Sequence, residues 1–115
     1  MKKGAVLLVE DEVMIRMMVA DMLEELGYSV AAQAGTVPSA VKLAQTTDFD
    51  FAVLDVNLAG SDIGPVADAI AVLNRPFIFA TGYGLEGLPP KHRDRPFLNK
   101  PFSMENLAEK ISGIN

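Results

Sequence analysis

The chain has 115 residues, of which 50% are apolar and 22% charged, so we expect a single domain spanning residues 1–115 with no separate output domain. Its net charge of −5 argues against nucleic acid as a direct partner, because phosphate binding needs a basic face. The absence of cysteine excludes disulfides, thiolate metal sites and thiol nucleophiles, which leaves carboxylates, hydroxyls, lysine and the single His92 for any chemistry.

Short apolar runs alternate with longer helical patterns along the chain, which is typical of βαβ units. The predicted strands cover residues 5–9, 28–34, 51–54, 77–80 and 97–98. The predicted helices cover residues 12–26, 37–46, 64–73 and about 104–112. Thr36 and Ser103 stand where N-caps belong. We therefore expect an α/β fold: a doubly wound five-stranded parallel sheet in the flavodoxin-like order 2-1-3-4-5.

Residues 83–95, "YGLEGLPPKHRDR", interrupt this alternation where the fourth helix of a doubly wound fold belongs. Two adjacent prolines remove hydrogen-bond donors and clash with a helix interior, so we expect a loop or at most a short helical turn. His92 lies in this segment without an obvious acid and hydroxyl beside it, and we expect it on the surface.

No apolar stretch approaches the roughly 20 residues needed to cross a bilayer. The first four residues, "MKKG", run directly into a strand-like segment and do not resemble a signal peptide. We therefore expect no membrane insertion and a cytoplasmic location.

Polar residues collect at the carboxyl ends of the predicted strands. Glu10 and Asp11 follow the first strand, Asp55 the third, Thr81 the fourth and Lys100 the fifth. In an open parallel sheet these ends share one edge, and ligands bind where the strand order reverses, here between the first and third strands. Three carboxylates in one crevice repel one another unless a cation lies between them. Mg²⁺ (or Mn²⁺) suits this set, since it takes oxygen ligands and needs only one or two carboxylates.

The same edge carries what phosphoryl transfer requires. With a cation bound, Asp55 can stay ionised and accept a phosphoryl group, as carboxylates do in aspartyl-phosphate chemistry. Lys100 would supply a fixed positive charge and Thr81 a hydroxyl for the phosphoryl oxygens. Gly82 would let the backbone approach without a side chain in the way.

These residues resemble those of a bacterial response-regulator receiver domain over about residues 4–111, and "PFIFATGYG" with "PFLNKPF" resembles the FATGUY subgroup. The resemblance implies that Asp55 is the phosphoacceptor. It also implies that Glu10, Asp11 and Asp55 hold the metal together with the backbone carbonyl of Asn57.

The resemblance further implies that Thr81 and Lys100 bind the phosphoryl group, that Thr81 and the aromatic Phe97 form a switch, and that the bond before Pro101 is often cis. A protein of this kind takes its phosphoryl group from a histidine kinase or a histidine phosphotransfer protein. It then slowly hydrolyses its own aspartyl phosphate, so it is not an enzyme in the usual sense. It signals to a downstream protein or acts as a phosphate sink in two-component phosphorelay signalling, as a monomer or weak dimer.

The sequence departs from the common pattern in ways that leave alternatives open. Glu10 stands where aspartate is commoner, Ala59 stands where proline is frequent, and the altered fourth helix removes part of the usual signalling face. One alternative is an adaptor that binds a partner without phosphorylation. Another is a small aspartate-nucleophile phosphatase of the haloacid-dehalogenase type, but that class expects a second acid where this chain has Asn57.

Overall fold

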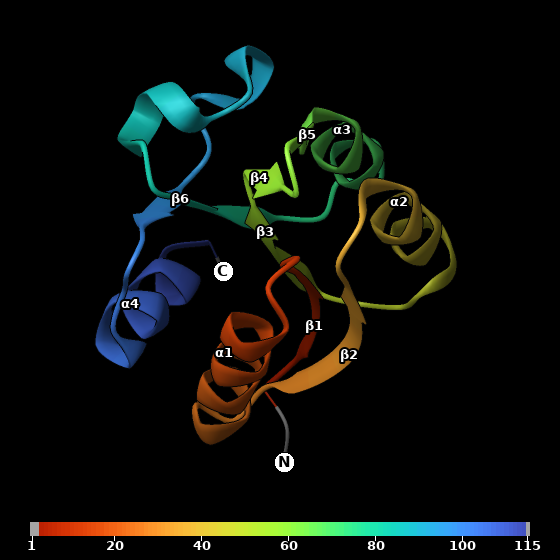
Figure 1. Ribbon diagram of the computed structural model, residues 1–115. Coiled ribbons are helices and arrows are strands. Elements are labelled where there is room, and N and C mark those ends of the chain that lie inside the picture. The colour runs from red at the N-terminus through yellow and green to blue at the C-terminus, as the bar shows by residue number, and fades with distance from the viewer. Residues whose placement is uncertain (1–2, 115) are drawn as a thin grey trace.

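The computed structural model describes residues 3–114 and shows one parallel sheet with helices on both faces (Figure 1). The strands of this sheet are β1 (Ala5–Val9), β2 (Ser29–Ala34), β3 (Phe51–Asp55), β6 (Phe77–Thr81) and β7 (Phe97–Asn99). They lie in the order β2-β1-β3-β6-β7, and every neighbouring pair is parallel. The predicted order 2-1-3-4-5 is therefore confirmed, with β6 and β7 as the fourth and fifth strands of the sheet.

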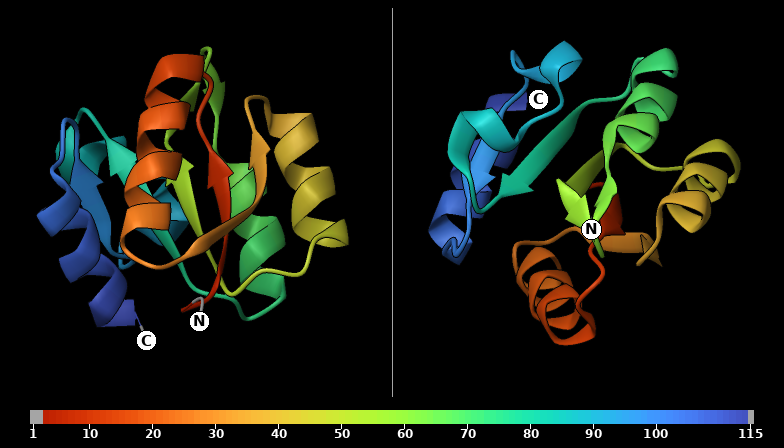
Figure 2. Two further views of the ribbon diagram at one scale, coloured as in Figure 1. Left: turned by 90° about the horizontal axis from the view of Figure 1, so that it is seen from below. Right: turned by 45° about the horizontal axis from the view of Figure 1, so that its top comes forward.

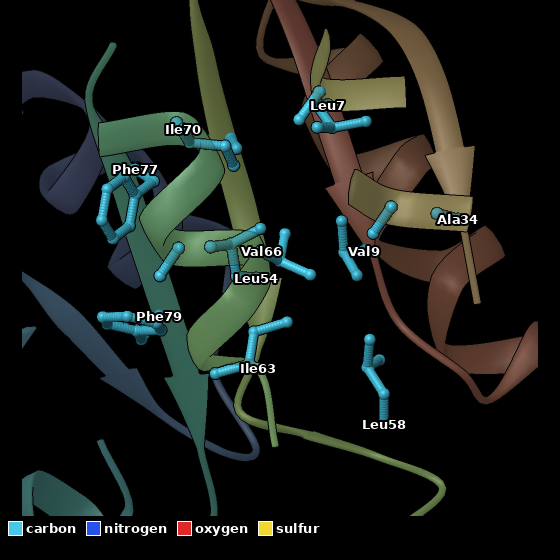
Figure 3. Close-up of a cluster of buried hydrophobic side chains, with 14 of the residues drawn as sticks. Leu7, Val9, Ala34, Leu54, Leu58, Ile63, Val66, Ile70, Phe77 and Phe79 are labelled. Carbon is cyan, nitrogen blue, oxygen red and sulfur yellow. The ribbon is translucent and has the colours of Figure 1, made fainter. Parts of the chain in front are cut away.

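Two helices cover each face of the sheet (Figure 1, Figure 2). One face carries α1 (Val13–Glu25) and α4 (Met104–Ile114), and the other carries α2 (Val37–Thr46) and α3 (Gly64–Val72). Buried side chains form one apolar cluster on each side, and Figure 3 shows the cluster beneath α3. Successive residues of a strand serve opposite clusters, which explains why the central strands read as continuous apolar runs.

The predicted N-caps of two helices are present. The Thr36 hydroxyl accepts a hydrogen bond from the Ser39 amide at 3.3 Å. At the start of α4, the Ser103 hydroxyl accepts from the Asn106 amide at 3.0 Å, and the Asn106 side chain accepts from the Ser103 amide at 3.2 Å. This reciprocal pair satisfies two backbone donors that the first helical turn would otherwise leave free.

A small hairpin, which is not among the predicted strands, follows β3. Strands β4 (Asn57–Leu58) and β5 (Ser61–Asp62) pair antiparallel across a two-residue turn. Ala59 and Gly60 have φ angles of 52° and 86°, as the tight turns of two-residue hairpins require. The Asn57 side chain accepts a hydrogen bond from the Gly60 amide at 2.8 Å and helps to close the turn.

The segment between β6 and β7 contains two short 3-10 turns in place of a helix, as predicted. These are η1 (Gly84–Gly87) and η2 (Pro90–His92), seen beyond the end of β6 in Figure 1. Leu88, between them, is buried in the same cluster as Phe77 and Phe79. The segment is therefore packed onto the sheet even though it is not a regular helix.

The prediction that His92 lies on the surface is wrong, because its residue is only 7% exposed. Its ring packs against Phe77, with ring centroids 5.6 Å apart and the planes nearly perpendicular. Its Nε2 lies 2.8 Å from Oδ1 of Asp68 on α3, whose other oxygen is 3.0 Å from the Lys91 ammonium. Asp68 and His92 are 24 residues apart, so only the tertiary fold brings this acid to the histidine.

Among residues 3–114, no helix is both long enough and apolar enough to cross a membrane.

Substituting His92 tests whether it anchors the segment between β6 and β7. His92→Ala removes the ring from Phe77 and leaves Asp68 with Lys91 alone, so we expect the free energy of unfolding to fall by about 2–3 kcal/mol in urea denaturation. Lys91→Ala is the control, and because its ion pair is largely exposed the loss should stay within about 0.5 kcal/mol. If both variants lost the same free energy of unfolding, the buried ring of His92 would not be what anchors the segment.

The same variant makes a prediction about pH. Hydrogen bonds from His92 and then from Lys91 lower the pKa of Asp68 below its ordinary value of 3.8. A carboxyl with a depressed pKa stabilises the folded state above its unfolded pKa and loses that contribution as the pH falls through the folded value. We therefore expect the difference in the free energy of unfolding between wild type and His92→Ala to be largest above pH 3.8 and to decrease below it.

Candidate functional site

Four strands of the sheet deliver side chains to one edge, as the sequence predicts. Glu10 and Asp11 follow β1, Asp55 ends β3 and Thr81 ends β6. Lys100 follows β7, and its amide donates a hydrogen bond to the Thr81 carbonyl at 2.8 Å, which extends the pairing of β6 and β7 by one residue. The edge is thus built from backbone pairing, and the position of each side chain follows from the strand that precedes it.

Three carboxylates gather there. Oxygen atoms of Glu10, Asp11 and Asp55 lie within 4.8 Å of one another. Glu10 is 4% exposed and Asp55 is 5% exposed, so two of the three acids are almost fully buried. They open onto a pocket of about 250 Å³, which is lined by Glu10, Asp11, Glu12, Asp55, Asn57, Ala59, Tyr83 and Lys100.

Lys100 lies across the two buried acids. Its ammonium is 3.0 Å from Oε1 of Glu10 and 3.3 Å from Oδ1 of Asp55. Burial by itself would lower the pKa of Lys100, but its hydrogen bond to Glu10 and the charge of Asp55 outweigh burial, and the pKa is raised. The lysine therefore stays charged. The bond from Lys100 to Pro101 is cis, as the resemblance implied.

Backbone contacts hold Glu10 in place. Its Oε2 accepts a hydrogen bond from the Glu12 amide at 3.2 Å, and its carbonyl accepts one from the Arg16 guanidinium at 2.9 Å. Arg16 reaches this carbonyl across Gly35, where an added Cβ would lie 2.8 Å from Nη1. The sequence did not single out Arg16 or Gly35, because nothing in their local pattern shows that β1, α1 and β2 meet there.

The site holds more carboxylates than positively charged groups, and this imbalance dominates its electrostatics. Desolvation, followed by the neighbouring charge of Glu10, raises the pKa of Asp55 to about 7, while Lys100 acts in the opposite direction. Three carboxylates face one ammonium, so the cluster retains excess negative charge even with Lys100 in place.

This donor set fits Mg²⁺. The ion prefers carboxylate and other oxygen ligands, keeps several waters and needs few protein ligands. The oxygens of Glu10, Asp11 and Asp55 converge within one small volume that also opens to a pocket, which leaves room for waters or substrate. The charge imbalance supplies the electrostatic reason for a cation to bind.

Thr81 and Gly82 lie at this edge but do not line the pocket. Thr81 is fully buried, and its hydroxyl accepts a hydrogen bond from the Tyr83 amide at 2.9 Å. Gly82 is exposed, and an added Cβ there would meet no atom within 4 Å. The hydroxyl predicted to serve a phosphoryl group is thus bonded to the loop in this state.

The remaining predicted residues divide between the pocket and the core. Asn57 lines the pocket from the β4–β5 hairpin. Phe97 is half-buried on β7, pairs in register with Phe79 and packs against the cluster beneath α3. Tyr83, for which the sequence analysis gave no role, lines the pocket while remaining largely exposed.

Comparison with known proteins identifies the family. Residues 6–112 match the response regulator receiver domain. The chain belongs to this family. As a receiver domain, it has the acidic cluster and the lysine at the expected edge of the sheet, and receiver domains generally use Mg²⁺.

Its relatives are bacterial regulators. The transcriptional regulatory protein PdtaR of Mycobacterium tuberculosis is 36% identical over 110 residues, which is 92% of this chain and 54% of PdtaR. This receiver domain therefore spans about half the length of the curated relatives it matches.

Solved structures agree with the fold. The solution structure of SdrG from Sphingomonas melonis Fr1 has a TM-score of 0.85 and 40% identity, covering 96% of this chain and 94% of that chain. The PhyR receiver domain of Erythrobacter litoralis has a TM-score of 0.84 and 31% identity, and the match covers 98% of this chain and 90% of that chain.

The unusual pKa of Asp55 makes a prediction for the metal-free protein. A carbon-13 NMR titration of the Asp55 carboxyl in magnesium-free buffer should give a midpoint near pH 7. Glu10→Gln removes the neighbouring charge and should move that midpoint downward, toward 3.8.

Asp21→Asn, on the exposed surface of α1, is the matched control and should leave the midpoint unchanged. An unshifted midpoint in Glu10→Gln would contradict the coupling of the two buried acids.

Proposed function

We propose that this receiver domain accepts a phosphoryl group on Asp55 from a phosphohistidine of a histidine kinase or histidine phosphotransfer protein, and that the phosphorylated form controls binding to a downstream protein. The observation that carries the proposal is the Lys100 ammonium, which bridges Glu10 and Asp55 at 3.0 and 3.3 Å beside an open acidic pocket. A buried acid with a charged lysine and an approach for substrate is what an aspartyl phosphoacceptor requires.

The proposed transfer uses the residues of the pocket directly. An ionised oxygen of Asp55 attacks the phosphorus and forms a new P–O bond. The P–N bond to the donor histidine breaks, and its electron pair returns to the imidazole, which takes up a proton. Lys100 would then move with the charge from the Asp55 carboxylate to the phosphoryl oxygens. Hydrolysis reverses the state, because water attacks the phosphorus, inorganic phosphate leaves and the Asp55 carboxylate is restored.

Glu10, Asp11, Asp55 and the carbonyl of Asn57 are the residues that would hold Mg²⁺. When bound, the ion would neutralise charge on the phosphoryl oxygens during transfer. In the same proposal, Thr81 and the backbone at Gly82 would contact the phosphoryl group, and Phe97 would respond to the movement of Thr81.

The relatives support a signalling role. One solved structure is the BeF3-activated conformation of SdrG, which matches this chain with a TM-score of 0.79 and 40% identity. Another, PhyR of Bartonella quintana, is described as an anti-anti-sigma factor, and this chain covers 47% of it. We extend from these relatives only that the output here is an interaction with another protein. A stand-alone receiver in the cytoplasm remains a prediction.

Phosphorylation can be tested by intact-protein mass spectrometry after incubation with acetyl phosphate. Wild type with magnesium should gain about 80 Da, the mass of one phosphoryl group, because Asp55 is the acceptor. Asp55→Asn should gain nothing, and chelation of magnesium should reduce the gain in wild type.

Asp48→Asn, at an exposed acid in the loop between α2 and β3, is the control and should be phosphorylated normally. A folded wild-type protein that binds magnesium but never gains mass, with acetyl phosphate or with a phosphorylated histidine phosphotransfer protein, would contradict the proposal and favour a phosphorylation-independent adaptor.

A further inference from the structure

The Thr81 hydroxyl is held beneath the turn η1. Thr81 is fully buried, and its Oγ1 accepts a hydrogen bond from the Tyr83 amide at 2.9 Å. Turn η1 packs beside both β6 and β7, directly over the end of the strand that carries Thr81. The hydroxyl is therefore hydrogen-bonded to the loop, and Thr81 is not one of the residues that line the acidic pocket.

Gly87, the last residue of η1, makes this arrangement possible. A Cβ placed on Gly87 would overlap the Oγ1 of Thr81 and would lie 3.1 Å from the Cβ of Tyr83. Gly87 is not among the glycines with positive φ, so its backbone conformation is open to any residue. Position 87 requires glycine because the Thr81 hydroxyl occupies the space that a Cβ would need.

The turn has little freedom to move away from Thr81. Immediately after Gly87, Leu88 is buried in the cluster with Phe77 and Phe79. Four residues further on, His92 packs on Phe77 and bonds to Asp68 of α3. A side chain added at Gly87 would meet a fixed turn on one side and the hydroxyl of Thr81 on the other. The hydroxyl is the easier of the two to displace, since one χ1 rotation moves it.

We propose that Gly87 is a positioning residue that sets the resting rotamer of Thr81, storing its hydroxyl on the Tyr83 amide until a phosphoryl group on Asp55 draws it into the pocket. The second half of this inference rests on the proposed function. The first half concerns the unphosphorylated protein alone. Any side chain at position 87 would expel the hydroxyl from its resting place and make it available to the phosphoryl group without the cost of breaking its bond to Tyr83.

The experiment uses Gly87→Ala in the full chain and reads the Thr81 rotamer first. Three-bond scalar couplings of the Thr81 methyl carbon report χ1 by NMR, and hydrogen exchange reports protection of the Tyr83 amide. In unphosphorylated Gly87→Ala we expect a changed Thr81 χ1 and faster exchange at Tyr83. The initial rate of phosphorylation by acetyl phosphate should rise roughly fivefold, the shift expected when one neutral hydrogen bond no longer competes.

Two further variants separate positioning from a general structural effect. Gly113→Ala, in α4, also lacks a positive φ and adds a Cβ that meets no atom within 4 Å, so it should change none of the three readouts. In a Thr81→Ala background, Gly87→Ala should have no effect on phosphorylation, because the hydroxyl through which it acts is gone. Thermal unfolding of each variant confirms that it is folded.

The outcomes distinguish the two proposals. An unchanged Thr81 rotamer in Gly87→Ala overturns the role of Gly87, and so does an effect of equal size in the Thr81→Ala background. If wild type accepts no phosphoryl group, the proposed function fails by itself, while the rotamer and exchange measurements still decide whether Gly87 positions Thr81.

Discussion

The burial of like charges at one edge of the sheet is the constraint on which the rest of this structure depends. Glu10, which follows β1, and Asp55, which ends the neighbouring strand β3, are both nearly inaccessible to water, and the charge of Glu10 makes Asp55 harder to ionise. One lysine only partly offsets this, and the pKa of Asp55 stays near 7. A cation bound between these carboxylates would offset their repulsion, which agrees with the general use of Mg²⁺ by receiver domains.

The apolar clusters on the two faces hold this unfavourable site together. Strand β3 is buried along its whole length and β1 is buried from Val6 to Val9, so the backbone next to the acids has little freedom to relax the repulsion. Two segments near this end of the sheet depend on special local geometry. The β4–β5 hairpin needs a positive φ at Ala59, and the turn η1 needs the absence of a side chain at Gly87, which lies against the Thr81 hydroxyl.

The segment between β6 and β7 shows how a helix can be replaced without loosening the sheet. Leu88 and His92 reach into the cluster that a helix would otherwise cover, and Asp68 ties the segment to α3. This anchoring fixes the part of the segment that directly follows η1. It also explains why the turn over Thr81 has a definite position despite having no regular helix around it.

The sequence alone predicts the strands and helices, the order of the strands, the N-caps of α2 and α4 and the polar residues that follow the strands. Strand positions and caps follow from local patterns, and the strand order follows from the doubly wound fold that alternating strands and helices favour. Three features required the assembled fold: the burial of His92, the hydrogen bond from Arg16 to the carbonyl of Glu10, and the hydrogen bond that the Thr81 hydroxyl accepts from the Tyr83 amide. Each of these depends on segments that the chain brings together only when the sheet is assembled, and no local pattern encodes such a meeting.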